Sequence, residues 1–243
     1  MNESPKKTIQ SLKKAYQSIA HDFSQSRRSH WAEFSFFADF IPEGSKVLDL
    51  GCGNGRFYGY LDEQGKLIDY TGVDFCPDFI KIAREKYPQQ EFIEQDMTEL
   101  DLGKRYGRII SIASFHHIPS RKLRKKTLKL LFEHLEDDGL LLLSVWNLWQ
   151  WRYFFPILRS FLRFLGSFFR EDPRDLFIPF GKQKVLRYYH AFIPFELRSL
   201  LKKSGFIIES SEISGFNYLF VCRKNLLSTK SHPLLIKPAV PSY

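Results

Sequence analysis

Short apolar runs alternate with segments of helical spacing between residues 46 and 149. Each run ends at a polar residue, which is typical of buried strands that stop at the edge of a sheet. We therefore expect strands over Lys46–Asp49, Tyr70–Val73, Glu91–Gln95, Arg108–Ala113 and Leu140–Val145. Helical patterns separate them, for example over Pro77–Tyr87 and Arg121–Leu135. This alternation predicts an α/β fold with a doubly wound, mostly parallel sheet.

The segments on either side have different patterns. From Thr8 to Phe40 apolar residues recur at helical spacing. A helix over Pro194–Ser204 precedes two short strands, Ile207–Ser210 and Tyr218–Cys222, which would pair as an antiparallel hairpin at the sheet edge. We expect an N-terminal helical extension at 1–44, the main domain at 45–225 with an inserted helical segment at about 147–186, and a flexible tail at 226–243.

The inserted segment is both apolar and basic. Residues 146–169 combine many aromatic and aliphatic side chains with Arg152, Arg159 and Arg163, and the apolar residues cover more than one face of a helix. Four interpretations remain open: a lid over a substrate cleft, an element that contacts RNA, a helix at a membrane interface, or a helix packed into the domain.

The net charge of the whole chain indicates which classes of binding partner fit this protein. The 243 residues carry a formal net charge of +9. An excess of this size fits a polyanionic partner such as nucleic acid, or an anionic membrane surface, although general solubility would explain it as well.

Other features indicate a cytoplasmic protein. There is no apolar run long enough to span a bilayer, and residues 1–7 lack the apolar core of a secretory signal. Cys52, Cys76 and Cys222 are far apart and form no C-x-x-C pair, so we expect buried thiols rather than disulfides or metal ligands. No metal site is predicted.

A glycine-rich turn follows the first expected strand. Gly51, Gly53 and Gly55 come directly after the carboxylate of Asp49, and a helix begins near Arg56. Glycines let the backbone approach a ligand closely, and the first N–H groups of a helix favour an electron-rich ligand. The spacing is G-x-G-x-G and not the G-x-G-x-x-G of dinucleotide-binding proteins. A nucleotide-like cofactor is predicted.

The acidic residues at the ends of successive strands indicate which cofactor is bound, because their order resembles that of a known protein family. Three strands end at Asp49, Asp74 and Asp96, the last followed by Met97, and a fourth runs into Ser114–Ile118. This ordered set resembles the class I S-adenosylmethionine-dependent methyltransferases and implies a seven-stranded Rossmann-like sheet. In that family the first acid faces the methionine part of S-adenosylmethionine, the second binds the ribose diol, and the third lies beside the adenine. A dehydrogenase, or a domain that has lost its ligand, is the alternative.

The flanking segments resemble one branch of that family, the tRNA wobble carboxymethyluridine methyltransferases. Ala15–Arg27, the segment Ala113–His117, and the R-Y-Y-H-A-F run from Arg187 to Phe192 are the matching parts. The resemblance implies that the enzyme esterifies the carboxymethyl group of a wobble uridine in tRNA. Eukaryotic members act with a small zinc-binding activator protein.

The implied reaction needs little acid–base chemistry. A carboxylate is already ionised at neutral pH, so catalysis depends on alignment and on the exclusion of water. A cation should orient the carboxylate, and arginine suits this role because it can form paired hydrogen bonds. Arg27 and Arg187 are the candidates and Arg28 is a weaker third; each would otherwise be a surface charge.

Several further residues are candidates for acceptor binding. His116 and His190 would contact the acceptor or serve as structural histidines. Tyr16 and Tyr188 would stack on an unstacked base, and the basic run 121–126 would follow tRNA phosphates.

Two other functions compete with this prediction. A small-molecule O-methyltransferase, acting on a quinone, a lipid or a natural product, would use His116 or His117 as the base for a hydroxyl acceptor. A non-catalytic subunit that binds cofactor or RNA is the second, although the intact acids disfavour it.

Overall fold

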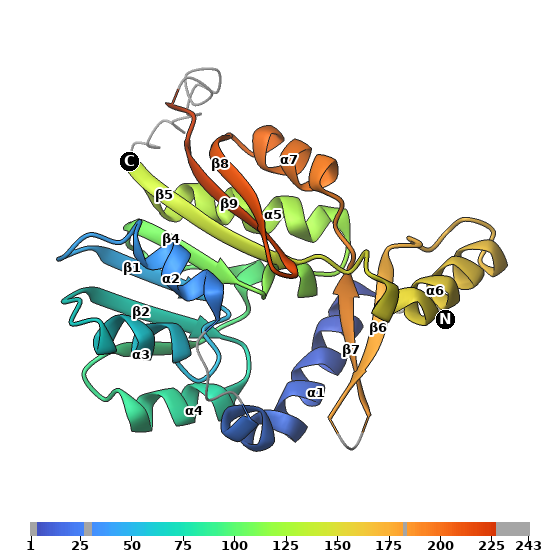
Figure 1. The fold of residues 1–243 in the computed structure, drawn as a ribbon, viewed down its shortest axis with the longest axis horizontal. Helices are drawn as coiled ribbons and strands as arrows, with labels where there is room; N and C mark the ends of the chain where they lie inside the picture. Colours follow the sequence, from blue (N-terminus) through green and yellow to red (C-terminus); the bar gives the residue numbers. More distant parts are fainter. Residues whose placement is uncertain (1–3, 27–30, 182–183, 227–243) are drawn as a thin grey trace, which may run out of the picture.

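The computed structural model describes residues 4–26, 31–181 and 184–226. Its centre is a seven-stranded sheet in the order β3-β2-β1-β4-β5-β9-β8 (Figure 1). The five strands β1 to β5 are parallel, and β9 and β8 are antiparallel. The predicted doubly wound sheet with an antiparallel edge hairpin is therefore confirmed. The strands are β1 (Lys46–Leu50), β2 (Asp69–Asp74), β3 (Glu91–Glu94), β4 (Tyr106–Ile112), β5 (Leu135–Trp146), β8 (Phe206–Ser214) and β9 (Asn217–Lys224).

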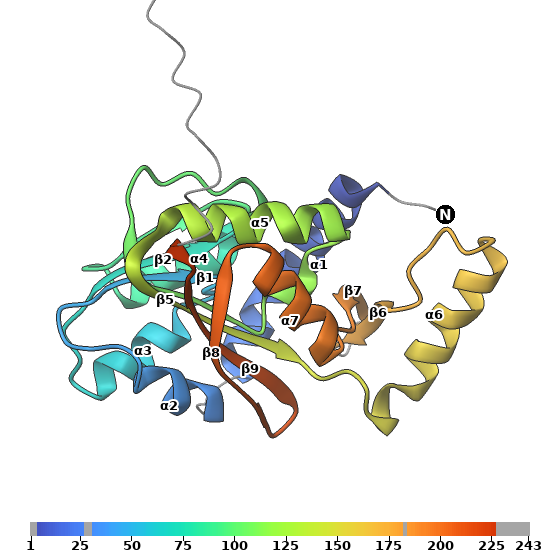
Figure 2. The ribbon, with the colours of Figure 1, turned by 90° about the horizontal axis from the view of Figure 1, so that it is seen from above.

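Helices cover both faces of this sheet. Figure 2 shows α5 on one face and α2 and α3 on the other. The central strands are consequently buried on both sides, as in other parallel sheets. The helices are α1 (Pro5–Ser26), α2 (Ala32–Ala38), α3 (Arg56–Glu63), α4 (Pro77–Lys86), α5 (Arg121–His134), α6 (Phe154–Gly166) and α7 (Pro194–Lys203), and three 3₁₀ turns are η1 (Met97–Glu99), η2 (Phe115–His117) and η3 (Trp151–Tyr153).

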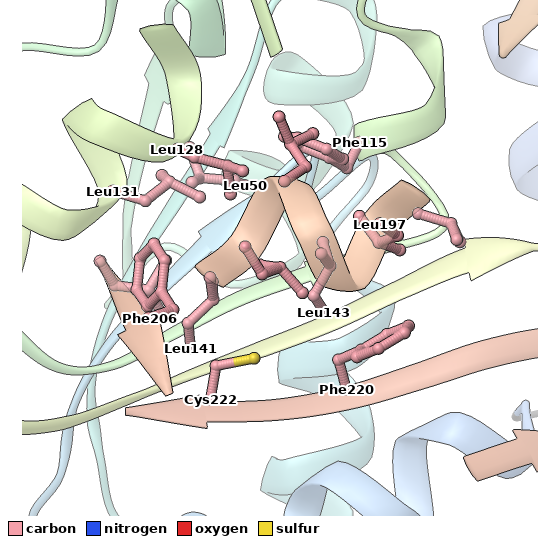
Figure 3. Close-up of a cluster of buried hydrophobic side chains, with 14 of the residues drawn as sticks. Leu50, Phe115, Leu128, Leu131, Leu141, Leu143, Leu197, Phe206, Phe220 and Cys222 are labelled. Atoms are coloured by element: carbon pink, nitrogen blue, oxygen red, sulfur yellow. The ribbon is translucent and has the colours of Figure 1, made fainter. Parts of the chain in front are cut away.

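Alternation along β5 divides the core into two apolar layers. Leu141 and Leu143 pack in the layer that contains α5 and α7, whereas Leu142 packs in the layer that contains α2 and α3. Successive side chains of a strand point to opposite faces, so one leucine-rich strand supplies both layers. Figure 3 shows the first layer, where Leu128 and Leu197 meet the strand residues.

Helix α1 does not cover a face of the sheet. Its apolar side, including Leu12 and Ile19, packs against Phe79 of α4 and against Phe180 and Val185 of the hairpin described next. In Figure 1, α1 lies beyond the ends of β2 and β4, between the sheet and this hairpin. The predicted N-terminal helical extension thus closes one side of the domain.

The inserted segment contains a strand as well as the predicted helix. The strands β6 (Asp175–Phe180) and β7 (Val185–His190) form a separate two-stranded antiparallel sheet. The predicted helix is present as α6, whereas β6 was not expected, because Pro179 obscures the strand pattern. Proline is tolerated in β6 because both strands of a two-stranded sheet are edges. The R-Y-Y-H run forms most of β7.

Two predictions about the chain as a whole can be compared with the structure. The three cysteines are buried and unpaired, as predicted. Within the described ranges, no helix has both the length and the apolar character needed to cross a bilayer. The predicted flexible tail lies outside the described residues, apart from Leu226.

Candidate active site

A cavity that is partly open to solvent lies where the strand order reverses between β1 and β4. In parallel sheets this position leaves a crevice at the carboxyl ends of the strands. The loops after β1, β2, β3 and β4 form its floor, and α1 forms a wall. Residues on its surface include Tyr16, Phe23, Trp31, Asp49, Gly51, Gly53, Asn54, Asp74, Asp96, Met97, Ser114 and His117.

The glycine-rich turn has the backbone that the sequence predicts. Gly51, Gly53 and Gly55 all have positive φ, between 56° and 77°. Gly51 is also sterically constrained, because a Cβ there would lie 2.4 Å from the Cβ of Ser114. Ser114 cannot easily move, since it is buried and its hydroxyl donates a 2.7 Å hydrogen bond to the carbonyl of Leu50.

Replacing Gly51 by alanine should therefore destabilise the fold through both strain and overpacking, by about 2–5 kcal/mol. Gly44 provides the matched control: it has φ of 70°, but a Cβ there has no neighbour within 4 Å. Gly44→Ala should lower the free energy of unfolding by only about 1–2 kcal/mol, which is the cost of a positive φ at alanine. Urea denaturation of both variants measures the difference. Equal losses would contradict the close approach of the turn to Ser114.

Asp49 and Asp74 are buried carboxylates on the cavity wall. Asp49 accepts a 2.7 Å hydrogen bond from the hydroxyl of Tyr70. Asp74 accepts hydrogen bonds from the backbone N–H groups of Gly53 at 3.0 Å and Cys76 at 2.9 Å. Burial raises the pKa of Asp49 to about 7, against the lowering effect of the Tyr70 hydrogen bond. Burial likewise raises the pKa of Asp74 to about 6, although its backbone hydrogen bonds oppose the shift.

The raised pKa values of Asp49 and Asp74 indicate which kind of ligand the cavity favours. Desolvation penalises the ionised form of each acid. A ligand that donates hydroxyl hydrogens or carries positive charge would offset that penalty. S-adenosylmethionine has both, in its ribose diol and in its sulfonium and ammonium groups.

The third acid has a different local role. Asp96 caps η1, because its Oδ1 accepts a 2.8 Å hydrogen bond from the N–H of Thr98. Asp96 and Met97 both line the cavity, and their contact with a cofactor stays a prediction. Asn54, which the sequence analysis did not single out, lines it as well. Its side-chain Nδ2 is buried with no hydrogen-bond partner in the described part of the chain, and it is thus a donor that a polar ligand would satisfy.

The residues present therefore fit S-adenosylmethionine. Asp49, Asp74 and Asp96 with Met97 would hold it, together with the backbone of the glycine-rich turn. When bound, S-adenosylmethionine supplies an electrophilic methyl group on a sulfonium centre.

Aromatic side chains form the wall opposite the strand ends. Tyr16 of α1 packs edge-on against Phe23 and Phe75, at centroid distances of 6.2 and 6.1 Å. Phe79 of α4 lies 5.4 Å from Phe23. Phe23 therefore belongs to both the helix packing and the cavity surface.

His117, rather than His116, lies on the cavity wall. Residues of a 3₁₀ turn are rotated by about 120° from one to the next, so two adjacent histidines of η2 point in different directions. His116 is fully buried, and its Nδ1 accepts a 3.2 Å hydrogen bond from the N–H of Trp146. A direct contact between His116 and a ligand stays a prediction that this placement does not support.

His117 belongs to a hydrogen-bonded chain that ends at an arginine. Its Nδ1 lies 2.7 Å from the carbonyl oxygen of Tyr188, which can only accept, so Nδ1 carries the hydrogen. Its Nε2 lies 2.7 Å from the hydroxyl of Tyr16. Arg187 donates from Nη1 to the same hydroxyl at 3.3 Å. Burial and the charge of Arg187 lower the pKa of His117 to about 3, so this imidazole is neutral.

Arg187 is a buried cation without an acidic partner among the described residues. Its side chain is 3% exposed and lies between aromatic rings, with the guanidinium carbon 4.0 Å from the ring centroid of Phe180. Its Nε has no hydrogen-bond partner in the residues described here. The guanidinium does not line the cavity but stands directly behind Tyr16 and His117. Arg27 and Arg28 lie outside the described residues, so nothing tests their predicted roles.

Successive side chains of β7 point to opposite faces of the strand, so the residues of the R-Y-Y-H run lie on two different sides of it. Arg187 contacts Tyr16, whereas Tyr188 and His190 both bond to Asp175 of β6. Tyr188 and His190 do not reach the cavity. Their predicted contact with the acceptor is therefore not supported by their position.

His190 belongs to a network of charged side chains that joins β6, β7 and α7. Its Nδ1 lies 2.7 Å from Asp175, and its Nε2 lies 3.1 Å from Glu196. Asp172 and Asp175 bring ligand-type atoms within 4.8 Å of His190. These atoms already have protein partners, and Arg174 pairs with both Asp172 and Glu196. The network fixes the hairpin that carries Arg187.

Comparisons with known proteins agree with this geometry. The family model described as "Methyltransferase domain" matches residues 23–211. The tRNA (carboxymethyluridine(34)-5-O)-methyltransferase of Arabidopsis thaliana is 33% identical over 134 residues, which are 55% of this chain and 32% of that protein. The protein of the same name from Schizosaccharomyces pombe is 25% identical over 86% of this chain and 94% of its own length. The chain thus spans about a third of the first relative and nearly all of the second.

A solved structure shows the same fold. The Burkholderia thailandensis 1,6-didemethyltoxoflavin-N1-methyltransferase, crystallised with 1,6-didemethyltoxoflavin and S-adenosylhomocysteine, superposes with a TM-score of 0.65 at 21% identity, and the match covers 92% of each chain. The family match over most of the chain, the sheet topology and the acids at the strand ends lead to one conclusion. The chain belongs to the methyltransferase domain family and is a class I S-adenosylmethionine-dependent methyltransferase.

Proposed function

We propose that the enzyme methylates the carboxylate of 5-carboxymethyluridine at the wobble position of tRNA. The observation that carries the proposal is Arg187, a buried guanidinium one hydrogen bond behind the cavity wall with no carboxylate partner in the described ranges. An unpaired buried cation is costly. An anionic acceptor in the cavity would offset this cost.

The state of the histidines supports a carboxylate acceptor over a hydroxyl acceptor. A hydroxyl acceptor would need a general base with a pKa near neutrality. Burial lowers the pKa of His116 well below its ordinary value, and the pKa of His117 is about 3. The Nε2 of His117 is also occupied by the hydroxyl of Tyr16. A carboxylate needs no proton removed, so these neutral histidines are adequate for it.

In this proposal the residues of the site promote methyl transfer by orienting the acceptor carboxylate. His117 holds the hydroxyl of Tyr16, and Arg187 behind it places positive potential at the wall. Arg187 is therefore a positioning residue in this proposal and not the direct bidentate contact that the sequence suggested. The aromatic wall of Tyr16, Phe23 and Phe75 suits an unstacked pyrimidine.

A polynucleotide also needs a binding path outside the cavity. In the basic run at the start of α5, four side chains are exposed and follow closely on Ile118, which lines the cavity. They are Arg121, Lys122, Lys125 and Lys126. Arg124 is the exception, because it is buried and donates to the carbonyl of Ile118. The exposed four would follow tRNA phosphates, and binding should weaken with salt.

We also propose that the enzyme acts in the cytoplasm, and that a small zinc-binding activator of the kind used by eukaryotic members would join it. Co-purification of the tagged chain from its own cells, followed by zinc analysis of the bound fraction, tests the second point.

The test of the acceptor uses tRNA that carries 5-carboxymethyluridine, with methyl-labelled cofactor. We expect the labelled methyl group to appear in the wobble nucleoside. Mild base should then release it as methanol, since esters are base-labile. The same tRNA with 5-carbamoylmethyluridine is the control and should remain unlabelled. Label that enters only a lipid or quinone extract would replace this proposal with the small-molecule alternative.

A further inference from the structure

An arm of the molecule, defined here as residues 151–170, exposes apolar side chains that the active site does not use. It comprises η3, α6 and the turn after α6, and both views place α6 beyond the β6–β7 hairpin, away from the central sheet (Figures 1 and 2). None of its residues lines the active-site cavity, so it is not a lid. Ser160 is the only buried residue of α6, and only the side of the helix that carries Ser160 and Ile157 packs on the domain. The exposed large apolar residues of the arm are Trp151, Phe154, Phe155, Leu158, Phe161, Leu162, Leu165, Phe168 and Phe169.

The exposed large apolar side chains of α6 form one stripe. At about 100° per residue, positions 154, 155, 158, 161, 162 and 165 fall on the same side of the helix. The opposite side is fixed to the hairpin: the hydroxyl of Ser160 and the guanidinium of Arg163 both donate to the carbonyl of Asp175, at 2.7 Å each. The helix therefore cannot turn its apolar side inward without breaking these hydrogen bonds.

The turn after α6 extends this apolar surface under strain. Phe168 and Phe169 both have positive φ, 53° and 65°. Bulky residues avoid this conformation, and where it occurs it often serves a function. Phe168 is 84% exposed, so the strained backbone presents an aromatic side chain directly to the surroundings.

The charged residues of the arm itself are all basic, and the nearest acid in the chain, Glu171, pairs with Arg163 on the side of α6 that faces the hairpin. Between residues 147 and 170 there are four arginines and no acidic residue. Arg152, Arg159 and Arg170 are exposed. In α6, Arg159 lies about 40° from Phe155 around the helix axis, at the border of the apolar stripe.

From the stripe, the strained turn and these arginines, we propose that the arm binds the surface of an anionic lipid bilayer. An apolar side bordered by arginines, with exposed tryptophan and phenylalanine, is the pattern of helices that lie in a membrane interface. A second copy of the chain fits less well, since it would bring two sets of arginines together. RNA would use the arginines and the aromatic rings, but Leu158, Leu162 and Leu165 would gain nothing from it. The inference does not depend on which acceptor the active site methylates.

Vesicle sedimentation of the full chain tests the inference. We expect binding to vesicles of phosphatidylglycerol and phosphatidylcholine, little binding to phosphatidylcholine alone, and weaker binding at high salt. Phe155→Ser with Leu162→Ser should lower the partition coefficient at least about tenfold, since two inserted side chains are lost. The matched control is Leu67→Ser with Phe195→Ser, which removes two apolar residues that are 78% and 80% exposed elsewhere. The control should bind like the wild type.

Each contrary result has a distinct meaning. The substituted side chains are exposed, so equal thermal midpoints should show that both double variants fold. No sedimentation of the wild type with anionic vesicles, or equal loss in both variants, would overturn the proposal. A dimer that disappears in the arm variant, without vesicle binding, would assign the surface to a second copy. Loss of tRNA binding in that variant alone, with vesicle binding unchanged, would assign it to RNA.

Discussion

Asp74→Ala should weaken cofactor binding by about 100-fold or more, because the variant loses two charge-assisted hydrogen bonds from the ribose diol. The carboxylate lies on the cavity wall, held by the backbone of Gly53 and Cys76. Titration calorimetry with S-adenosylhomocysteine measures the effect. Asp69→Ala is the matched control: Asp69 begins the same strand, is exposed, and lies at the opposite edge of the sheet. Unchanged affinity in Asp74→Ala would refute the assignment of the ribose site.

The same carboxylate predicts a dependence on pH. The pKa of Asp74 in the folded protein is about 6, above its ordinary value of 3.8. Its contribution to the stability of the ligand-free enzyme is therefore fully present below the ordinary value and is lost as the pH rises through 6. Cofactor binding needs the ionised form, so affinity should fall as the pH drops from 7 to 5. Asp74→Asn should remove the part of the pH dependence of cofactor affinity that comes from Asp74. Asp49, whose pKa is about 7, should account for much of the pH dependence that remains.

Arg187→Met should lower kcat/KM for carboxymethyluridine tRNA by about 100-fold while cofactor affinity stays near that of the wild type. The expected loss corresponds to the removal of one charge from a poorly hydrated wall. Arg187→Lys keeps the charge and should recover part of the activity. Arg105→Met, at an arginine that is mostly exposed, is the control for a lost surface charge.

A second readout separates positioning from a purely structural role. The wild type should bind an anticodon stem-loop with 5-carboxymethyluridine more tightly than one with the neutral 5-carbamoylmethyluridine. Arg187→Met should bind the two alike. The variant should also be at least as stable as the wild type, because methionine replaces an unpaired buried cation. A destabilised variant that still discriminates between the two nucleosides would show that Arg187 only supports the fold.

The cofactor half of the site follows from local sequence. Asp49, Asp74 and Asp96 lie at or just past the carboxyl ends of β1, β2 and β3, and parallel strands place these ends at one edge of the sheet. The three acids therefore line one cavity, and the glycine-rich turn has the positive φ values that its glycines suggest. These features need only strand direction and backbone sterics.

The acceptor half could not be predicted in the same way. His116 and His117 are neighbours in the sequence, and only the path of η2 decides that His117 reaches the cavity. The R-Y-Y-H run suggests one functional group, but the alternation of β7 directs Arg187 toward α1 and His190 toward Asp175 and Glu196. The strand β6 was missed because Pro179 obscures its pattern.

The sequence by itself determined the alternation of strands and helices that predicts a doubly wound sheet, the glycine-rich turn and the acids at the strand ends, because each of these patterns involves residues close together in the chain. Only the tertiary structure decided that Arg187, Tyr16 and His117 form one hydrogen-bonded chain. It also decided that α6 carries its apolar side outward. Those outcomes depend on contacts between residues far apart in sequence, such as Tyr16 with Arg187, and on which face of a strand or helix the rest of the fold covers.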